Sequence, residues 1–409
     1  MNYIHRHMEG CIEKLSKNWS AILLTGPRQS GKTTMLRQLS EKENIGRKYV
    51  SLDDLSIREL AKNEPKMFLQ LYAPPVLIDE VQYAPELFNY IKIYIDEHHN
   101  PGDFWLTGSQ IFRLLTGVQE SLAGRVALLH MSPLSQREIA SAEPVAFSTD
   151  FETLLASSKY IKPASTPELY SRIWRGSMPR VNSDTTVDRN IYYSSYLSTY
   201  IERDVRELSG TIDALKFSRF TTAVAARTAQ LVNYKAIAED ADINQVQAKE
   251  WLNILETLGI VFFLHPYSNN VLKRTIKTPK LYFYDTGLVC YLTKWSSPEV
   301  AENGAMSGAL LENYAVSEIM KSYQNLGEEP FINYYRDHDA KEIDIIIEGD
   351  GKLCPVEIKK TTNPDRRIVK TFSLIEKSPL QRGNSAVLCM ADSLGAFDSN
   401  NLIVPIWLI

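Results

Sequence analysis

Eight residues near the start of the chain, 26–33, constrain its fold more than any other feature. They read Gly-Pro-Arg-Gln-Ser-Gly-Lys-Thr and match the phosphate-binding pattern G-x-x-x-x-G-K-[ST] at every fixed position. The two glycines let the backbone curl so that its N–H groups face phosphate oxygens. Residues 21–25 before the loop are an apolar run typical of a buried parallel strand, and residues 33–39 after it show helical spacing. Because of these flanks, a nucleotide site is favoured over a chance glycine-rich turn.

Each position of this loop has an expected task at a bound nucleotide. Lys32 would place a point charge against the β- and γ-phosphates, and the Thr33 hydroxyl would reach Mg²⁺. We therefore expect ATP and Mg²⁺ as cofactors. The residues expected to hold the nucleotide are Gly26, Pro27, Arg28, Gln29, Ser30, Gly31, Lys32, Thr33, Thr34 and Ser109.

A second strand with an acidic end is expected at residues 76–80, Val-Leu-Ile-Asp-Glu. Asp79 would hold the metal through water, and Glu80 would polarise the attacking water. Such a run alone is weak evidence, but its position about 50 residues after a phosphate-binding loop strengthens it. The order of strand, loop, helix and acidic strand predicts an α/β fold, the doubly wound parallel sheet of P-loop NTPases, with helices on both faces.

Two further positions could serve the same site. Residues 104–109 resemble a core strand that ends in polar groups, so Thr107 or Ser109 would sense the γ-phosphate, unless this is a plain exit from the strand. Arg125 is a candidate arginine finger that stabilises the transferred phosphate, either in its own chain or across a subunit contact. An ordinary surface salt bridge is the alternative for Arg125.

The composition of the chain excludes several classes of protein. With 409 residues and a net charge of −4, the chain has room for two to four domains and no global basic field that attracts nucleic acid. Its 4 cysteines are far apart, which argues against a disulfide framework or a zinc site. There is no long apolar run, so we expect a cytoplasmic protein without a membrane partner.

The middle of the chain predicts a winged helix. Residues 233–264 read as helix, turn, helix, glycine and strand, and residues 257–284 contain no acid but four bases, namely Lys273, Arg274, Lys277 and Lys280. A wing with this balance could contact DNA phosphates, whereas many winged helices bind protein or only link domains. Residues 188–208 predict a long helix, on which residues 202–204 could dock against the nucleotide domain, although a solvated face is the favoured interpretation.

A second constellation lies near the C-terminus. Residues 341–348 and 353–360 predict a hairpin with Asp344 on one strand and Glu357 and Lys359 on the same face of the other. This is the D…E-x-K arrangement of restriction-endonuclease-like nucleases, in which the carboxylates hold Mg²⁺ and the lysine orients water. Glu312, on a helix upstream, could complete the metal shell. The alternative is a hairpin with charged edges. The expected metal ligands of the whole chain are Thr33, Asp79, Glu312, Asp344 and Glu357.

Taken together, these motifs make the chain similar to a prokaryotic family that joins an AAA-like P-loop ATPase to a C-terminal domain of unknown function resembling PD-(D/E)xK nucleases. The resemblance rests on residues 26–33, 76–82, 106–109, 122–125, 133–135 with Glu138, 200–204, 285–288, 308–313, 342–344 and 357–359. One departure is Ser177, because the family tends to have a second glycine after Gly176. The resemblance implies ATP binding and hydrolysis.

The predicted organisation has four parts: an ATPase core (1–145), a helical linker or lid (146–214), a winged-helix-like domain (215–295) and a nuclease-like α/β domain (296–409). One hypothesis is an ATPase whose nucleotide state controls the winged-helix and nuclease-like modules, acting on DNA. The other is a signal-transducing ATPase switch that binds a protein or DNA partner without cleavage. A homo-oligomer is a further candidate partner. The complete loop and Asp79-Glu80 disfavour a scaffold with an inactive site.

Overall fold

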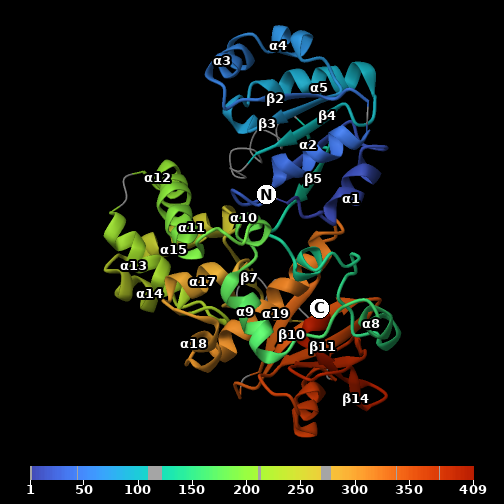
Figure 1. The fold of residues 1–409 in the computed structure, drawn as a ribbon, viewed down its shortest axis with the longest axis vertical. Helices are drawn as coiled ribbons and strands as arrows, with labels where there is room; N and C mark the ends of the chain where they lie inside the picture. The colour runs from blue at the N-terminus through green and yellow to red at the C-terminus, as the bar shows by residue number, and fades with distance from the viewer. Residues whose placement is uncertain are drawn as a thin grey trace.

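The structure is a computed structural model that describes residues 2–43, 45–108, 122–210, 213–268, 278–337, 339–376 and 378–409. Three regions follow one another down the long axis of the molecule (Figure 1). The N-terminal sheet lies at the top, the helical middle region lies below it, and the C-terminal sheet lies at the bottom, beside the chain's C-terminus.

A five-stranded sheet forms the N-terminal region. Its elements are α1 (Met8–Leu15), β1 (Ala21–Thr25), α2 (Lys32–Glu43), β2 (Lys48–Ser51), α3 (Leu55–Asn63), α4 (Pro65–Leu71), β3 (Val76–Asp79), η1 (Val81–Tyr83), α5 (Leu87–His98), β4 (Phe104–Thr107), β5 (Val126–His130) and α7 (Gln136–Ile139). The strand order is β2-β3-β4-β1-β5, and all neighbours are parallel, which confirms the predicted parallel sheet.

Alternate side chains of β1 enter two separate cores, as the period of two along a strand requires. Ala21 and Leu23 pack with residues of α3, α4 and α5, whereas Ile22 and Leu24 pack with residues of α1 and α2. Helices therefore cover both faces of the sheet, as expected.

Helices dominate the middle region. Its elements are α8 (Phe151–Ser158), α9 (Thr166–Arg175), α10 (Pro179–Ser183), α11 (Arg189–Tyr196), the π-helical turn η2 (Leu197–Ile201), α12 (Glu202–Ser209), α13 (Ala214–Ala225), β6 (Gln230–Leu231), α14 (Tyr234–Ala241), α15 (Gln245–Thr257), β7 (Val261–Leu264), β8 (Lys280–Phe283), α17 (Thr286–Leu292) and α18 (Pro298–Asn303). The helix pair α14–α15 and strand β7 appear where the sequence predicted them, and β6, β8 and β7 form a small antiparallel sheet.

The predicted basic wing needs one correction. Lys280 is only 3% exposed, on β8, and its ammonium forms ion pairs with Glu312 and Glu342. A lysine that is buried between two carboxylates cannot contact DNA phosphates. The other three predicted wing bases, Lys273, Arg274 and Lys277, lie outside the described residues.

The C-terminal region is a mixed sheet with one long helix. Its elements are α19 (Ser307–Gln324), β9 (Ile332–Arg336), β10 (Glu342–Gly349), β11 (Lys352–Ile358), η3 (Arg366–Ile375), β12 (Gln381–Arg382), β13 (Ser385–Cys389), β14 (Gly395–Asp398), β15 (Asn401–Pro405) and η4 (Ile406–Leu408). The order is β14-β15-β13-β11-β10-β9, with β12 beside β11. β10 and β11 form the predicted antiparallel pair.

One hydrophobic cluster extends from Phe147 to Ile409 and includes residues of all three parts predicted after the ATPase core. The middle and C-terminal regions therefore share a core. Among the described residues, no helix has the length and apolar character needed to cross a membrane.

Candidate nucleotide-binding site

The loop between β1 and α2 has the backbone that its glycines predict. Gly26 has φ +142° and Gly31 has φ +95°, both in the region that L-residues avoid. A Cβ atom on Gly26 would lie 2.2 Å from the carbonyl oxygen of Met131, so no larger residue fits there. The neighbouring segment at the end of β5 thus holds the loop in its curled form.

Lys32 lies folded over this loop. Its Nζ donates hydrogen bonds to the carbonyl oxygens of Gly26 and Pro27, both at 2.9 Å, and the residue is only 7% exposed. Burial lowers the pKa of Lys32 to about 8, against the opposing effect of Glu80 and Asp79. These contacts place the ammonium at the loop, where phosphate oxygens would be held.

Asp79 ends strand β3 and gathers three hydroxyl groups. Its Oδ1 accepts from Thr33 Oγ1 at 2.9 Å and from Thr107 Oγ1 at 2.7 Å, and its Oδ2 accepts from Tyr49 at 3.2 Å. Burial raises the pKa of Asp79, while the hydroxyl donors oppose that rise. Two of the five predicted metal ligands, Thr33 and Asp79, therefore lie together. Thr107 is fully buried and orients Asp79, and Ser109 lies outside the described residues.

Glu80 follows Asp79 in the left-handed backbone conformation, with φ +53°. Its carboxylate accepts a hydrogen bond from the amide of Gln82. A cavity of about 230 Å³ brings together seven of the predicted residues, namely Arg28, Gln29, Gly31, Lys32, Thr33, Thr34 and Glu80. The predicted base and the predicted phosphate ligands thus face one space.

The arginine-finger prediction for Arg125 is wrong for its own chain. Ala21 pairs with Val126 and Thr25 pairs with His130, so Arg125 lies before the start of β5, at the sheet edge opposite the loop. Four strand residues separate the two edges by about 13 Å. The Arg125 guanidinium instead forms a two-pronged ion pair with Asp96, at 2.6 and 3.0 Å. A role across a subunit contact stays a prediction.

A different arginine, Arg28, carries an ion pair that the sequence did not reveal. Its Nε and Nη2 donate to the two carboxylate oxygens of Asp204 at 2.7 and 2.9 Å. Asp204 belongs to α12 and is 2% exposed, so the favoured interpretation of residues 202–204 as a solvated face is wrong at this position. The other interpretation, that these residues dock against the nucleotide domain, is confirmed at Asp204, and Tyr196 of the preceding helix also donates to the Arg28 carbonyl, at 3.3 Å.

The middle region also contacts the loop through the end of α15. A Cβ atom on Gly259 would lie 3.1 Å from Pro27 Cδ and 3.3 Å from His130 Cε1. Burial, together with the charge of Lys32, lowers the pKa of His130 to about 4, so this imidazole is neutral at physiological pH. The glycine that ends α15 therefore allows the middle region to pack directly on the nucleotide loop.

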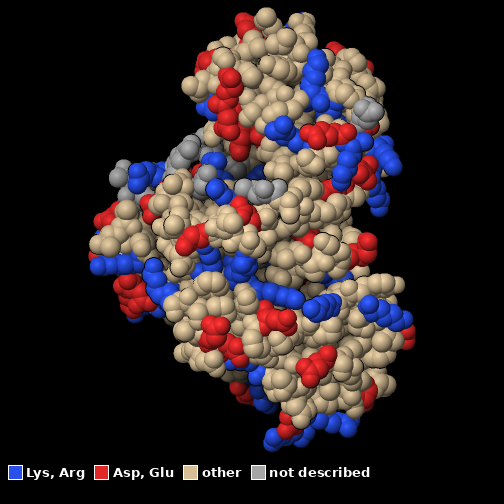
Figure 2. All heavy atoms as spheres, in the orientation of Figure 1, with Lys and Arg blue, Asp and Glu red and all other residues tan. Residues whose placement is uncertain are grey.

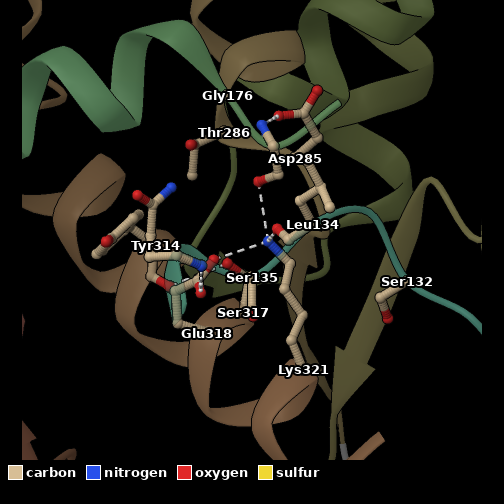
Figure 3. Close-up of polar contacts among 12 residues, drawn as sticks. Ser132, Leu134, Ser135, Gly176, Asp285, Thr286, Tyr314, Ser317, Glu318 and Lys321 are labelled. Carbon is tan, nitrogen blue, oxygen red and sulfur yellow. Dashed lines mark hydrogen bonds and ion pairs between the residues drawn. The ribbon is translucent and has the colours of Figure 1, made fainter. Parts of the chain in front are cut away.

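A buried polar network joins the N-terminal region to α19 (Figure 3). Lys321 Nζ donates to Glu318 Oε1 at 2.8 Å, to Ser177 Oγ at 2.9 Å and to the Leu134 carbonyl at 3.2 Å. Glu318 also accepts from the backbone N–H of Gln136, at 2.7 Å. Helix α19 is thus hydrogen-bonded to the segment that follows β5.

The same network explains why a serine stands at position 177, where the resembling family tends to have a second glycine. Gly176 has φ +85°, and a Cβ there would lie 2.2 Å from the Tyr193 hydroxyl, so the first glycine is required. Ser177 is not among the described residues with positive φ, and its N–H donates to Asp285 at 2.8 Å. A serine therefore fits at this position and adds the bond from Lys321.

At the other end of the molecule, two predicted acidic residues of the C-terminal sheet, Asp344 and Glu357, lie close together. Ile345 pairs with Val356, which sets Asp344 opposite Glu357. Lys359 Nζ lies between them, at 3.4 Å from Asp344 Oδ2 and 2.6 Å from Glu357 Oε2. Burial and the charge of Asp344 raise the pKa of Glu357 to about 8. Glu357 and Lys359 line a cavity of about 520 Å³.

Glu312 stands near this pair but is held by other groups. Its Oε1 accepts from Lys280 at 3.0 Å and from Tyr282 at 2.8 Å. Burial and the charge of Asp344 raise the pKa of Glu312. In the described part of the chain, no three acidic, histidine or cysteine side chains are grouped to hold a metal ion. The expected metal-binding shell of Glu312, Asp344 and Glu357 is therefore not formed, because these carboxylates form ion pairs with lysines.

Comparison with known proteins agrees with the N-terminal geometry. Residues 18–140 match the model of a family described as an AAA domain. Residues 166–299 and 307–409 match two domains of unknown function, DUF8612 and DUF4143. The match and the loop together define an AAA-like P-loop ATPase domain at the N-terminus. Nothing in the matches to the other two regions assigns them an activity.

The similar proteins are distant. Two uncharacterised proteins, from Mycobacterium bovis and Mycobacterium tuberculosis, are each 29% identical over 349 residues, which cover 84% of this chain and 71% of theirs. Among solved structures, a Walker-type ATPase of Pyrococcus abyssi is 14% identical, covers 70% of this chain and 94% of its own, and has a TM-score of 0.44. AMPPCP-bound DnaA from Aquifex aeolicus is 16% identical, covers 61% and 85%, and has a TM-score of 0.31. At these scores neither structure defines this fold.

Proposed function

We propose that this protein is a Mg²⁺-dependent ATPase whose nucleotide state controls its middle and C-terminal regions. The observation that carries the proposal is that Lys32, Thr33 and Glu80 line the same cavity beside the curled loop. Within a region that matches an AAA domain, this set supplies a phosphate cradle, a metal-side hydroxyl and a candidate base.

The residues present fit a magnesium ion. The Thr33 hydroxyl and the Asp79 carboxylate are hard oxygen donors, 2.9 Å apart, of the kind that Mg²⁺ prefers. Bound Mg²⁺ would neutralise charge on the β- and γ-phosphates. Thr107 and Tyr49 keep the Asp79 carboxylate oriented toward Thr33, and Glu80 would accept a proton from the attacking water.

Direct contacts support the proposed control of the other regions. The loop meets α12 through the Arg28–Asp204 ion pair and the end of α15 through Pro27 and Gly259. The segment after β5 is bonded to α19, the helix that also carries Glu312. A change of loop shape on nucleotide binding would therefore reach both helices, because packed elements transmit displacement rather than absorb it.

The test of this proposal is calorimetric titration of the full chain with MgATP. We expect wild type to bind and Lys32→Ala to lose on the order of a hundredfold in affinity, since the charge at the β- and γ-phosphates disappears. Lys62→Ala, at an exposed lysine of α3, is the control and should bind as wild type does. Absence of binding by folded wild type would refute the proposal.

A second function, cleavage of DNA by the C-terminal region, has specific support. Asp344, Glu357 and Lys359 lie within hydrogen-bond reach of one another, in the arrangement of PD-(D/E)xK nucleases. Their carboxylate oxygens suit Mg²⁺, but Lys359 would first have to leave the space between them, and Glu357 would have to lose its proton.

Plasmid DNA tests this second function. With Mg²⁺ or Mn²⁺ we expect nicking by wild type that is lost in Asp344→Asn and kept in Asp350→Asn, a residue of the adjoining turn. Nicking that survives Asp344→Asn would refute the assignment. Absence of nicking by wild type would favour the switch that binds a partner without cleavage.

The helix pair α14–α15 and the β6-β8-β7 sheet have the plan of a winged helix, which supports DNA or protein as the partner of this region. On the face in Figure 2, basic side chains collect in a band across the middle of the molecule, whereas both signs mix elsewhere. A local band of this kind offers contacts to phosphates that the net charge of −4 does not.

A further inference from the structure

We propose that the side chain of Arg28 binds the terminal phosphate of the triphosphate, and that Asp204 is a positioning residue that competes with this phosphate for the guanidinium. The inference rests on the proposed ATPase function and deepens it. It assigns a phosphate-sensing role to an ion pair between the loop and α12, and so identifies how nucleotide state reaches the middle region.

The position of Arg28 is the first argument. Arg28 is the third residue of the loop and lines the same cavity as Lys32, Thr33 and Glu80. Its guanidinium already makes two parallel bonds to a carboxylate, at 2.7 and 2.9 Å. A phosphate presents the same pair of oxygens to a guanidinium, so the exchange of one partner for the other keeps both hydrogen bonds.

The buried charge of Asp204 is the second argument. The side chains of Arg28 and Asp204 are 15% and 3% exposed, so water screens this pair only weakly. Asp204 also acts electrostatically on Lys32, across the site. A triphosphate bound beside Arg28 would be repelled by the buried Asp204 carboxylate that holds the guanidinium, and this repulsion would be relieved if Asp204 and α12 moved away.

The chain around Asp204 is built so that it can respond. The π-helical turn η2 lies directly before α12, and π-helical turns interrupt the regular bonding of a helix and occur often at functional sites. Tyr196, at the end of α11, bonds the Arg28 backbone from the other side of this turn. The loop therefore holds both sides of a deformable joint.

Arg28 also fills the role that Arg125 cannot fill within its own chain. A positive group near the terminal phosphate stabilises charge that develops during transfer, and Arg125 lies at the opposite edge of the sheet. The loop carries such a group within its own sequence. By thermodynamic linkage, a triphosphate that displaces Asp204 must bind more tightly when the Asp204 charge is removed.

The experiment compares the affinities of full-length variants for AMPPCP and for ADP, with Mg²⁺, by calorimetry. We expect Asp204→Asn to tighten AMPPCP on the order of tenfold and ADP by less than about twofold. Arg28→Lys, which keeps the charge but loses the paired geometry, should weaken AMPPCP more than ADP. Glu202→Gln, which neutralises a different acid of the same helix, is the control and should leave both affinities unchanged.

Amide hydrogen exchange in α12 provides a second measurement. If the ion pair were only structural, the bound nucleotide would not change this exchange rate. AMPPCP, but not ADP, should speed amide exchange in α12 of wild type. An unchanged AMPPCP-to-ADP affinity ratio in both Asp204→Asn and Arg28→Lys, with unaltered exchange in α12, would overturn the inference while leaving ATP binding intact. If Asp204→Asn fails to fold, the AMPPCP-to-ADP affinity ratio of Arg28→Lys decides whether the inference holds. Failure of wild type to bind either nucleotide would instead refute the proposed function itself.

Discussion

The two polar centres of this molecule are built in different ways. At the nucleotide site one continuous loop, 26–31, supplies the cradle, and Asp79 is surrounded by hydroxyl groups. In the C-terminal sheet the carboxylates come from separate elements, and ammonium groups occupy them. Hydroxyls leave a carboxylate available to a metal, whereas a lysine neutralises it. The first centre is therefore arranged for a ligand, whereas the second must rearrange before it can hold one.

The pKa shifts separate the two centres as well. Burial lowers the pKa of Lys32 to about 8 at the first, whereas burial and the charge of Asp344 raise the pKa of Glu357 to about 8 at the second. The first centre therefore prefers an added negative charge, as a triphosphate provides. At the second centre, Glu357 retains a proton near neutral pH when no metal ion is bound.

Glu80→Gln should give the largest effect, and this effect belongs to the first centre. The amide keeps the shape of the side chain but cannot accept a proton, so we expect steady-state ATP hydrolysis to fall by about 10²–10⁴-fold while MgATP affinity changes little. Phosphate release measured at saturating MgATP checks the first part, and calorimetry the second. Glu86→Gln, near the start of α5, is the matched control. Normal turnover in Glu80→Gln would show that another group positions the water.

Protonation of Glu357 predicts a smaller effect that belongs to the C-terminal centre. Its pKa is raised from the usual 4.5 to about 8, so the folded state binds more protons than the unfolded state between those pH values. Stability from this group is therefore present below about pH 4.5 and is lost as the pH rises through about 8.

Urea unfolding at pH 5 and pH 8, with divalent cations chelated, measures this loss. The decrease in unfolding free energy between the two pH values should be smaller in Glu357→Gln than in wild type. Identical decreases would show that Glu357 does not titrate in this range, and the contrast between the two centres would then be weaker.

Arg125→Ala should have the smallest effect. Its ion pair with Asp96 is partly exposed, and solvent-screened ion pairs of this kind contribute little to stability. We expect ATP turnover in dilute solution to stay within about twofold of wild type. A larger loss that appears only at high protein concentration would identify Arg125 as a finger that acts across a subunit contact.

Local patterns in the sequence determined the geometry of the candidate nucleotide site. The fixed glycines, the strand before them and the acidic end of β3 are features of short contiguous segments. Their backbone and side-chain periods follow from chain geometry alone, which is why the sequence predicted the cavity residues and the place of Asp79. The β10–β11 hairpin was predictable for the same reason.

Only the tertiary structure decided which distant groups meet. Arg28 and Asp204 are 176 positions apart in the sequence. Lys280 of β8 forms ion pairs with Glu312 of α19 and Glu342 of β10. Which edge of the sheet receives Arg125 depends on strand direction and register, and a pattern around one residue carries no such information. Buried ion pairs between remote segments follow from how helices and sheets pack, because burial forces each charge to find a partner that the local sequence does not name.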